Sequence, residues 1–197
     1  MTNDPLAGRQ PSTRPGTENY RLGTFVFLMA GTMLFAGLIG AYLVLRYGAG
    51  AWPGPGMPRL PVGLAGFNTL VIALSSLALH RGVRALRGLD ARGLRRALFA
   101  AACLGVLFLA LQVAQWSMLF GSGLSFSGTT YGTTFYVLTG VHAVHAVSGV
   151  AWLLAIALRQ RELWVPDRRQ RAIEVCALYW HFVGLVWLGL YVVLYLI

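Results

Sequence analysis

Four histidines are the residues of this chain that could bind a metal or carry a proton within an otherwise apolar sequence. Two of them, His142 and His145, stand three residues apart in "VLTGVHAVHAVSGV", and His181 follows in "YWHFVGLVW". On a helix, a spacing of three turns both imidazoles to nearly the same side. That arrangement suits one metal ion but cannot clamp a haem from opposite faces, and one histidine pair alone is a weak metal signal.

Helix packing is the alternative role for the same residues. On a helix, Thr139, His142, Ala146 and Gly149 share one face, and His145 lies at its edge. Small residues beside an imidazole are typical of close contacts between membrane helices, where the imidazole hydrogen-bonds a neighbour. We favour this structural role over a metal site, although the residue types alone leave both open. His80, next to Arg81, is expected at the membrane interface.

The last apolar segment has two faces when it is drawn as a helix: Glu174, His181 and Leu188 on one, and Trp180, Trp187 and Tyr191 on the other. Glu174 stands near the start of the segment and close to Arg171. An interfacial ion pair and a proton site are therefore equally good interpretations of Glu174. We expect the aromatic face to pack against a partner or lipid.

Several classes of chemistry have no support in the sequence. No carboxylate stands at the centre of an apolar segment and the chain has no Lys, whereas proton-coupled transporters and pumps usually need such a group. No phosphate-binding loop, nucleophile motif or metal cluster occurs. Cys103 and Cys176 both fall in apolar segments, so we expect two buried thiols rather than a disulfide or a closed metal site.

Composition indicates which elements must position these side chains. The chain has 197 residues, of which 57% are hydrophobic and 11% are charged, against about 25% charged in soluble domains. An all-α, polytopic membrane protein is predicted, with a membrane domain at 22–197 and a polar, loosely ordered, cytoplasmic tail at 1–21. Each of five apolar segments is long enough to cross a hydrocarbon core of about 30 Å: 22–45, 62–79, 97–120, 133–158 and 173–197.

The basic residues set the predicted orientation. All sixteen are Arg; three stand in the N-terminal tail, six between the second and third segments, and five between the fourth and fifth. Only Arg46 and Arg59 fall on the other side. By the positive-inside rule, the N-terminus is cytoplasmic and the C-terminus outside. The net charge of +10 is thus a topology signal, and no nucleic-acid partner is expected.

Several spaced motifs together resemble subunit III of haem–copper terminal oxidases of the cytochrome c oxidase type. "ALYWHFVGLVWLGLYVVLY" resembles the final helix of that family, and "TTFYVLTGVHAVHAVSGV" resembles the preceding one. "FLALQVAQW" is similar to its middle helix, and "WPGPGMPRLP" followed by "FNTLVIALSSLAL" is similar to an earlier segment. The similarity covers about residues 20–197 in the family order and matches the five-helix form.

The resemblance implies a non-catalytic subunit of an aerobic respiratory oxidase in the bacterial cytoplasmic (inner) membrane. Such a subunit binds no haem or copper itself, packs on subunit I with subunit II nearby, and leaves haem and copper to its partners. It holds phospholipids in a cleft and supports proton uptake and stability during turnover. Matching positions with structural or lipid-cleft roles are His142, His145, Glu174, Trp180 and His181. Arg81 and Arg84 are candidates to bind lipid head groups by charge.

Three departures from the family pattern weaken any proton-relay role. Gly31 in "LMAGTM", Gln115 in "VAQW" and Gly184 after "HFV" stand where the family usually has carboxylates. Such losses suit a divergent oxidase or the related accessory subunit of nitric oxide reductase. A small membrane transporter is the alternative from a different functional class.

The asymmetry of the Arg residues predicts the result of a topology experiment. A reporter that is active only in the cytoplasm should work when fused at the N-terminus or inserted at Asp90, and should be inactive after Ile197. Reporter activity after Ile197 would contradict the five-span topology.

Overall fold

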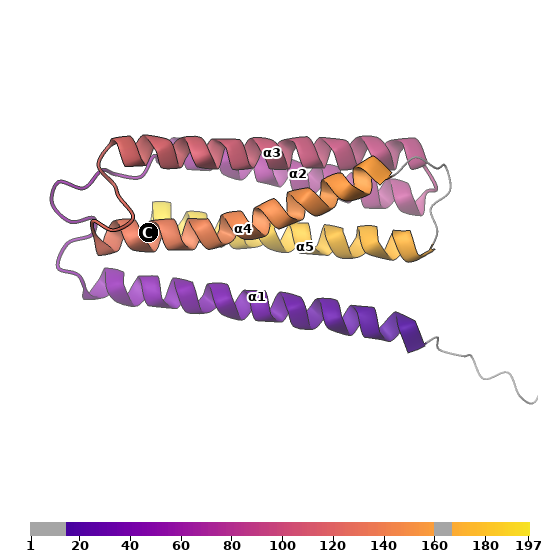
Figure 1. Ribbon diagram of the computed structural model, residues 1–197, viewed down its shortest axis with the longest axis horizontal. Coiled ribbons are helices and arrows are strands. Elements are labelled where there is room, and N and C mark those ends of the chain that lie inside the picture. Colours follow the sequence, from indigo (N-terminus) through magenta and orange to yellow (C-terminus); the bar gives the residue numbers. More distant parts are fainter. Residues whose placement is uncertain (1–14, 160–166) are drawn as a thin grey trace, which may run out of the picture.

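The computed structural model describes residues 15–159 and 167–197, with side chains from residue 22 to 159 and from 169 onward; within these ranges it contains only helices and their connections. The helices run roughly along one common axis (Figure 1). They are α1 (Pro15–Gly48), α2 (Val62–Arg87), α3 (Ala91–Gly121), α4 (Thr130–Arg159) and α5 (Asp167–Tyr191), which a π-helical turn, η1 (Val192–Leu196), continues.

The predicted all-α fold with five spans is confirmed, because five helices are long and apolar enough to cross a membrane. The helices extend past the apolar segments. α2 continues to Arg87 and α3 begins at Ala91, while α1 begins at Pro15, inside the predicted polar tail. Hydropathy marks the membrane core, whereas helical hydrogen bonding continues where long Arg side chains reach water. The rest of that tail, residues 1–14, lies outside the described residues.

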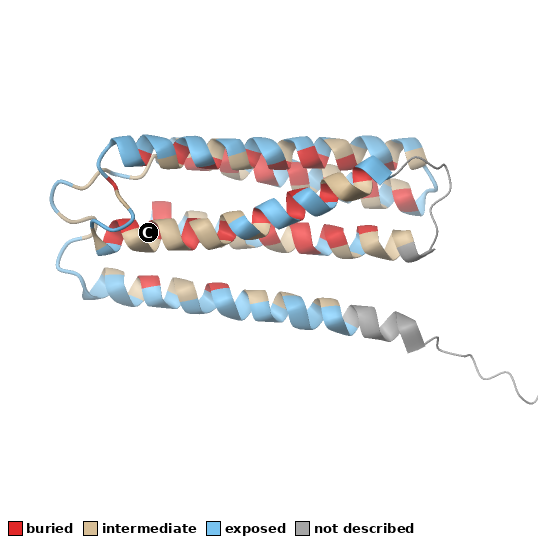
Figure 2. Cartoon of the chain, viewed as in Figure 1, coloured by how far each residue is buried: buried red, intermediate tan, exposed pale blue. Residues whose placement is uncertain are grey.

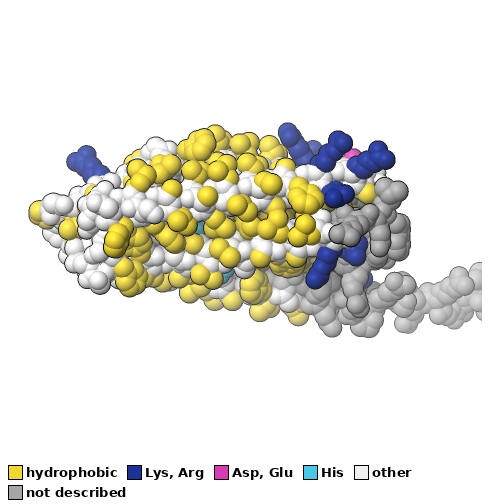
Figure 3. All heavy atoms as spheres, turned by 45° about the horizontal axis from the view of Figure 1, so that its top comes forward, with side chains coloured by type: hydrophobic (Ala, Val, Ile, Leu, Met, Phe, Trp, Pro, Cys, Tyr) yellow, Lys and Arg dark blue, Asp and Glu magenta, His cyan; other side chains and the backbone are white. Residues whose placement is uncertain are grey.

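A tight connection fixes the antiparallel pair α2 and α3. The chain reverses within three residues, and Leu89 takes a left-handed backbone conformation with φ 57°. Asp90 caps α3, since its side chain accepts a hydrogen bond of 2.9 Å from the backbone N–H of Gly93. The reversal brings basic side chains of both helices to one end of the molecule, which we name the arginine-rich end (Figure 3). Its described members are Arg81, Arg84, Arg87, Arg92, Arg95, Arg96, Arg159, Arg169 and Arg171.

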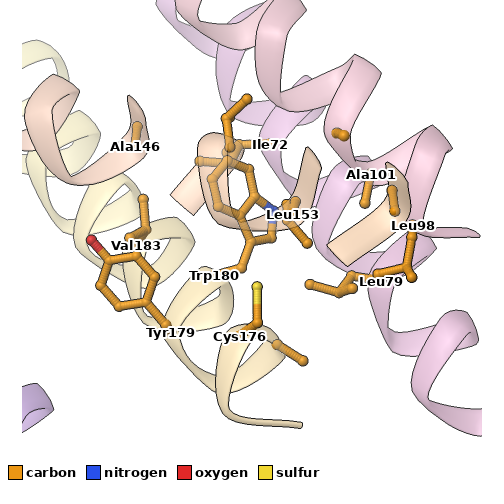
Figure 4. Packing of buried hydrophobic residues seen from close by; sticks show 14 of the residues in the cluster. Ile72, Leu79, Leu98, Ala101, Ala146, Leu153, Cys176, Tyr179, Trp180 and Val183 are labelled. Carbon is orange, nitrogen blue, oxygen red and sulfur yellow. The ribbon is translucent and has the colours of Figure 1, made fainter. Parts of the chain in front are cut away.

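Trp180 of α5 lies at the centre of the bundle core (Figure 4). Its indole N–H donates to the Ser75 hydroxyl at 3.0 Å, and that hydroxyl donates to the Ala101 carbonyl of α3 at 2.8 Å. The ring packs against Gly105 of α3 and Gly149 of α4, where an added Cβ would lie 3.0 and 2.7 Å from ring carbons. A single side chain of α5 therefore contacts three other helices, which is possible because both facing positions are glycine.

The expectation that the aromatic face of α5 meets a partner or lipid is wrong. Trp180 and Trp187 have no exposed surface, and Tyr191 is half-buried. The Trp187 indole N–H donates to the Thr69 hydroxyl of α2 at 3.0 Å. Large aromatic side chains fill the bundle because small residues on α2, α3 and α4 leave room for them. The expectation for Cys103 is also wrong, since this thiol is exposed on α3, whereas Cys176 is buried.

The first helix, α1, is peripheral and mostly exposed (Figure 2). Between residues 22 and 48, its buried side chains are Phe35 and Tyr42. Near the end opposite the arginines, Tyr42 accepts hydrogen bonds from Arg46 and from the indole of Trp52 at 3.1 and 3.2 Å. Arg46 also donates to the backbone carbonyl of Ile197. α1 is thus fastened by polar contacts at this end.

The fit of Trp180 against Gly149 predicts a measurable penalty for a single methyl group. Gly149→Ala should destabilise the fold by about 1 to 3 kcal/mol, because the added carbon overlaps the ring. Gly140→Ala on the same helix is the matched control, since an added Cβ there meets nothing within 4 Å. The measurement is the thermal unfolding midpoint of each detergent-solubilised variant. Equal midpoints would contradict the packing described for Trp180.

Candidate functional site

A groove of about 780 Å³ opens between α1, α2 and α5 at the arginine-rich end. Apolar side chains from all three helices form its walls, and polar side chains of α2 and α5 gather near its mouth. Phe35 and Tyr42, the buried side chains described for α1, lie farther along the bundle, whereas α1 lines the groove with Thr24, Phe25 and Leu28. Its lining consists of Thr24, Phe25, Leu28, His80, Val83, Arg84, Arg87, Glu174, Val175, Ala177, Leu178 and His181.

The charges around this groove are unequal in sign. Arg84 and Arg87 of α2 face a single acidic side chain, Glu174, whose Oε1 lies 3.8 Å from Nη2 of Arg87. Both partners are largely exposed, so this pair is worth about 1 kcal/mol or less. Two guanidinium groups and one carboxylate leave a net positive mouth above apolar walls. This combination suits a molecule with an anionic head and apolar chains.

His181 lines this groove and also a second hollow of about 370 Å³ between α2 and α5. Its ring centroid lies 6.4 Å from that of His80. The second hollow is almost wholly apolar and includes Ser76 and Gly184, where an added Cβ would lie 3.3 Å from the Ser76 hydroxyl. His181 therefore lies where the polar mouth gives way to an apolar surface.

The histidine pair of α4 does not converge on one point. His142 is buried, and its Nε2 lies 3.1 Å from the carbonyl of Val183 on α5. Nδ1 of His145 lies 2.8 Å from the Val141 carbonyl of its own helix, and its ring packs edge-on against Phe35 of α1 at 5.2 Å. One imidazole thus joins α4 to α5, and the other contacts α1.

Within residues 22–159 and 169–197, no group of three or more His, Cys, Asp or Glu side chains could hold a metal ion. Structural metal sites need four ligands and catalytic ones three, with a water in the open position. His142 itself makes the contact that the helix-packing interpretation predicts, because its Nε2 lies 3.1 Å from the Val183 carbonyl of α5.

The predicted site residues occupy different places. Glu174 and His181 meet in the groove with Arg84, whereas Trp180 and His142 lie in the core. Arg81, the other candidate for a lipid head group, is not among the lining residues of the groove.

Sequence reasoning missed His80 and Arg87 as groove residues. Their spacing with Arg84, four and then three residues along α2, is a helix-face signal that could have found them. The sequence does not show that this face of α2 lies opposite α5; the structure does.

Comparison with known proteins gives a consistent result. The sequence model of the family described as "Cytochrome c oxidase subunit III" matches residues 8–197. A protein of Synechocystis sp. named "Cytochrome c oxidase subunit 3" is 35% identical over 176 residues, which are 89% of this chain and 74% of that protein. "Probable cytochrome c oxidase subunit 3" of Nocardia farcinica is 35% identical, with 89% and 87% covered. The rat protein "Cytochrome c oxidase subunit 3" is 32% identical, with 90% and 69% covered.

Proposed function

The chain belongs to the cytochrome c oxidase subunit III family, and from this premise we propose that it is a non-catalytic subunit of a haem–copper terminal oxidase in aerobic respiration. Family membership over nearly the whole chain is the observation that carries this proposal. The geometry supports the non-catalytic role, because buried His142 and Trp180 are engaged in contacts between helices. Haem and copper belong to the partner subunits in this proposal.

The proposed partners are oxidase subunits I and II in the bacterial cytoplasmic membrane. As a multi-pass membrane protein, the chain exposes large apolar side chains that lipid or other subunits must cover. Phe25, Val26 and Phe27 on α1 are each more than half exposed. α1 is therefore a candidate to gain contacts on assembly. The Arg distribution supports an N-inside orientation, which places the arginine-rich end in the cytoplasm.

Phospholipid is the proposed occupant of the groove. The apolar walls match acyl chains, and Arg84 and Arg87 match a phosphate through charge-assisted hydrogen bonds. Placing these Arg residues at the cytoplasmic interface adds attraction to anionic lipids. A bound lipid would fill the space between α1 and the other helices and so stabilise the fold.

The proposed support for proton uptake involves the mouth of the groove. His80, His181 and Glu174 line this groove, and all three side chains can exchange protons. Two of the three positions where the resemblance implies a carboxylate, Gly31 and Gln115, are engaged in contacts between helices. Gly31 faces the ring of Phe182, where an added Cβ would lie 3.0 Å from Cζ, and Gln115 donates to the Tyr195 hydroxyl at 2.9 Å.

The groove chemistry predicts which Arg residues hold lipid. Changing Arg84 and Arg87 together to Ala should lower the amount of phospholipid retained by the purified complex, because the anionic head loses both of its cationic partners. Arg81→Ala is the matched control, since Arg81 stands on the same helix but does not line the groove. Native mass spectrometry measures the lipid retained. An equal loss in the control would contradict the assignment of lipid to this groove.

The contacts of His142 and His181 predict that substituting these residues weakens the packing of the helices but removes no haem or copper from the complex. His142→Gln and His181→Gln should leave the haem and copper absorbance of the intact complex unchanged. His142→Ala should loosen the α4–α5 contact by about 0.6 kcal/mol, because it removes the hydrogen bond to Val183. Absorbance spectra and oxygen consumption over many turnovers check both expectations. A missing haem band in a fully assembled His181→Gln complex would show that this imidazole is a ligand.

A further inference from the structure

Among the side chains that the structure describes, six polar ones are buried in the bundle, and they divide into two groups. Ser75 and Thr139 each donate to a backbone carbonyl and accept from a tryptophan N–H, so both are satisfied within the chain. The other four keep polar atoms without a partner among the described residues: both amide atoms of Asn68, both amide atoms of Gln112, Oε1 of Gln115 and Nδ1 of His142. Each of these four side chains is only 1% exposed.

The unpartnered atoms supply both donors and acceptors. Nε2 of His142 must donate to the Val183 carbonyl, because a carbonyl only accepts, and so the neutral ring leaves Nδ1 as an acceptor. Gln115 donates to Tyr195 and likewise leaves an acceptor, its Oε1. Asn68 and Gln112 each add an amide N–H₂ and a carbonyl oxygen. Exchanging N and O in either amide does not help, because both atom positions lack a partner.

Two of these side chains belong to residues at the same level of the antiparallel helices α3 and α4. Trp116 bonds Thr139, and a Cβ on Gly105 would lie 2.7 Å from Val150, which fixes the register of the two antiparallel helices. In this register, Gln112 lies level with His142.

Asn68 of α2 reaches the same level from another side. The bond from Ser75 to the Ala101 carbonyl fixes the register of α2 and α3 and places Asn68 near Phe108, one helical turn from Gln112. Phe108 packs on the His142 ring at 5.8 Å and on Trp187 at 5.0 Å. Asn68 and Gln112 therefore lie within about one helical turn of the level where Phe108 meets His142 and Trp187, and Gln115 follows Gln112 on α3.

We propose that the interior of the bundle is a binding site for water, held by Asn68, Gln112, Gln115 and His142 between α2, α3 and α4. The ligand must be small, neutral and able both to donate and to accept, because the four side chains offer both functions and carry no formal charge. At membrane depth no bulk water reaches these atoms, so a bound molecule has to stay as part of the fold. This inference does not depend on the proposed function of the chain.

A density map of the intact native complex, at a resolution that shows ordered water, tests this site directly. We expect density for at least one water within hydrogen-bonding distance of two of the four side chains. Density that instead shows the amides of Asn68 and Gln112 bonded directly to each other or to the chain, with no water between them, would overturn the proposal.

Variants give a second test. Gln112→Met keeps the length of the side chain but removes its polar atoms, so the water density beside it should disappear and the melting temperature of the complex should fall. Ser117→Ala on the same helix is the control, because the Ser117 hydroxyl is exposed and bonds the Val113 carbonyl of its own helix. A Gln112→Met complex that melts above the control would indicate a dry, unpaired amide and refute the site. Unchanged water density in that variant would also refute the role of Gln112.

Discussion

The bundle depends on one buried indole. Trp180 lies against glycines of α3 and α4 and donates its N–H to the Ser75 hydroxyl of α2, so that one side chain of α5 fixes the spacing of three helices. Lipid is as apolar as a helix surface, so the hydrophobic effect does not drive membrane helices together, and close packing and hydrogen bonds supply the specificity. A residue that combines a large flat surface with one donor meets both needs. The neighbouring contacts from Trp187 to Thr69 and from His142 to Val183 repeat this arrangement farther along α5.

The dependence of helix association on close packing and hydrogen bonds also explains why a groove exists beside α1. The four helices joined by aromatic contacts of α5 pack closely, whereas α1 is attached by Phe35 and by polar contacts of Tyr42 and Arg46 toward the opposite end. Little holds α1 against α2 and α5 at the arginine-rich end, and the groove of about 780 Å³ opens there. Beyond the groove, the ring of Phe182 lies against Gly31 of α1, where an added Cβ would be 3.0 Å from Cζ of that ring. The close packing of α2 to α5 and the groove beside α1 therefore both follow from which helices the aromatic side chains of α5 contact.

The sequence was sufficient for the number of helices, for the buried face of Thr139, His142, Ala146 and Gly149, and for the family. Hydropathy and helical spacing are local properties, and they report these features directly. The direction of the aromatic face of α5 was predicted wrongly, because it depends on glycines of α3 and α4 that are distant in the sequence. The groove partners His80 and Arg87 and the unpartnered amides Asn68 and Gln112 were missed for the same reason. Which side chains meet across helices depends on register, and a single sequence does not specify it.

We propose above that this chain is a structural subunit of a haem–copper oxidase, and its partners in the membrane test that role. The most direct measurement is to purify the tagged chain from its own membranes in mild detergent, identify the co-purifying subunits by mass spectrometry, and record the absorbance spectrum. We expect oxidase subunits I and II to co-purify with their haem and copper, and the haem bands to be lost when the chain is separated from them. Co-purification with nitric oxide reductase subunits, or haem that stays with the isolated chain, would contradict that role.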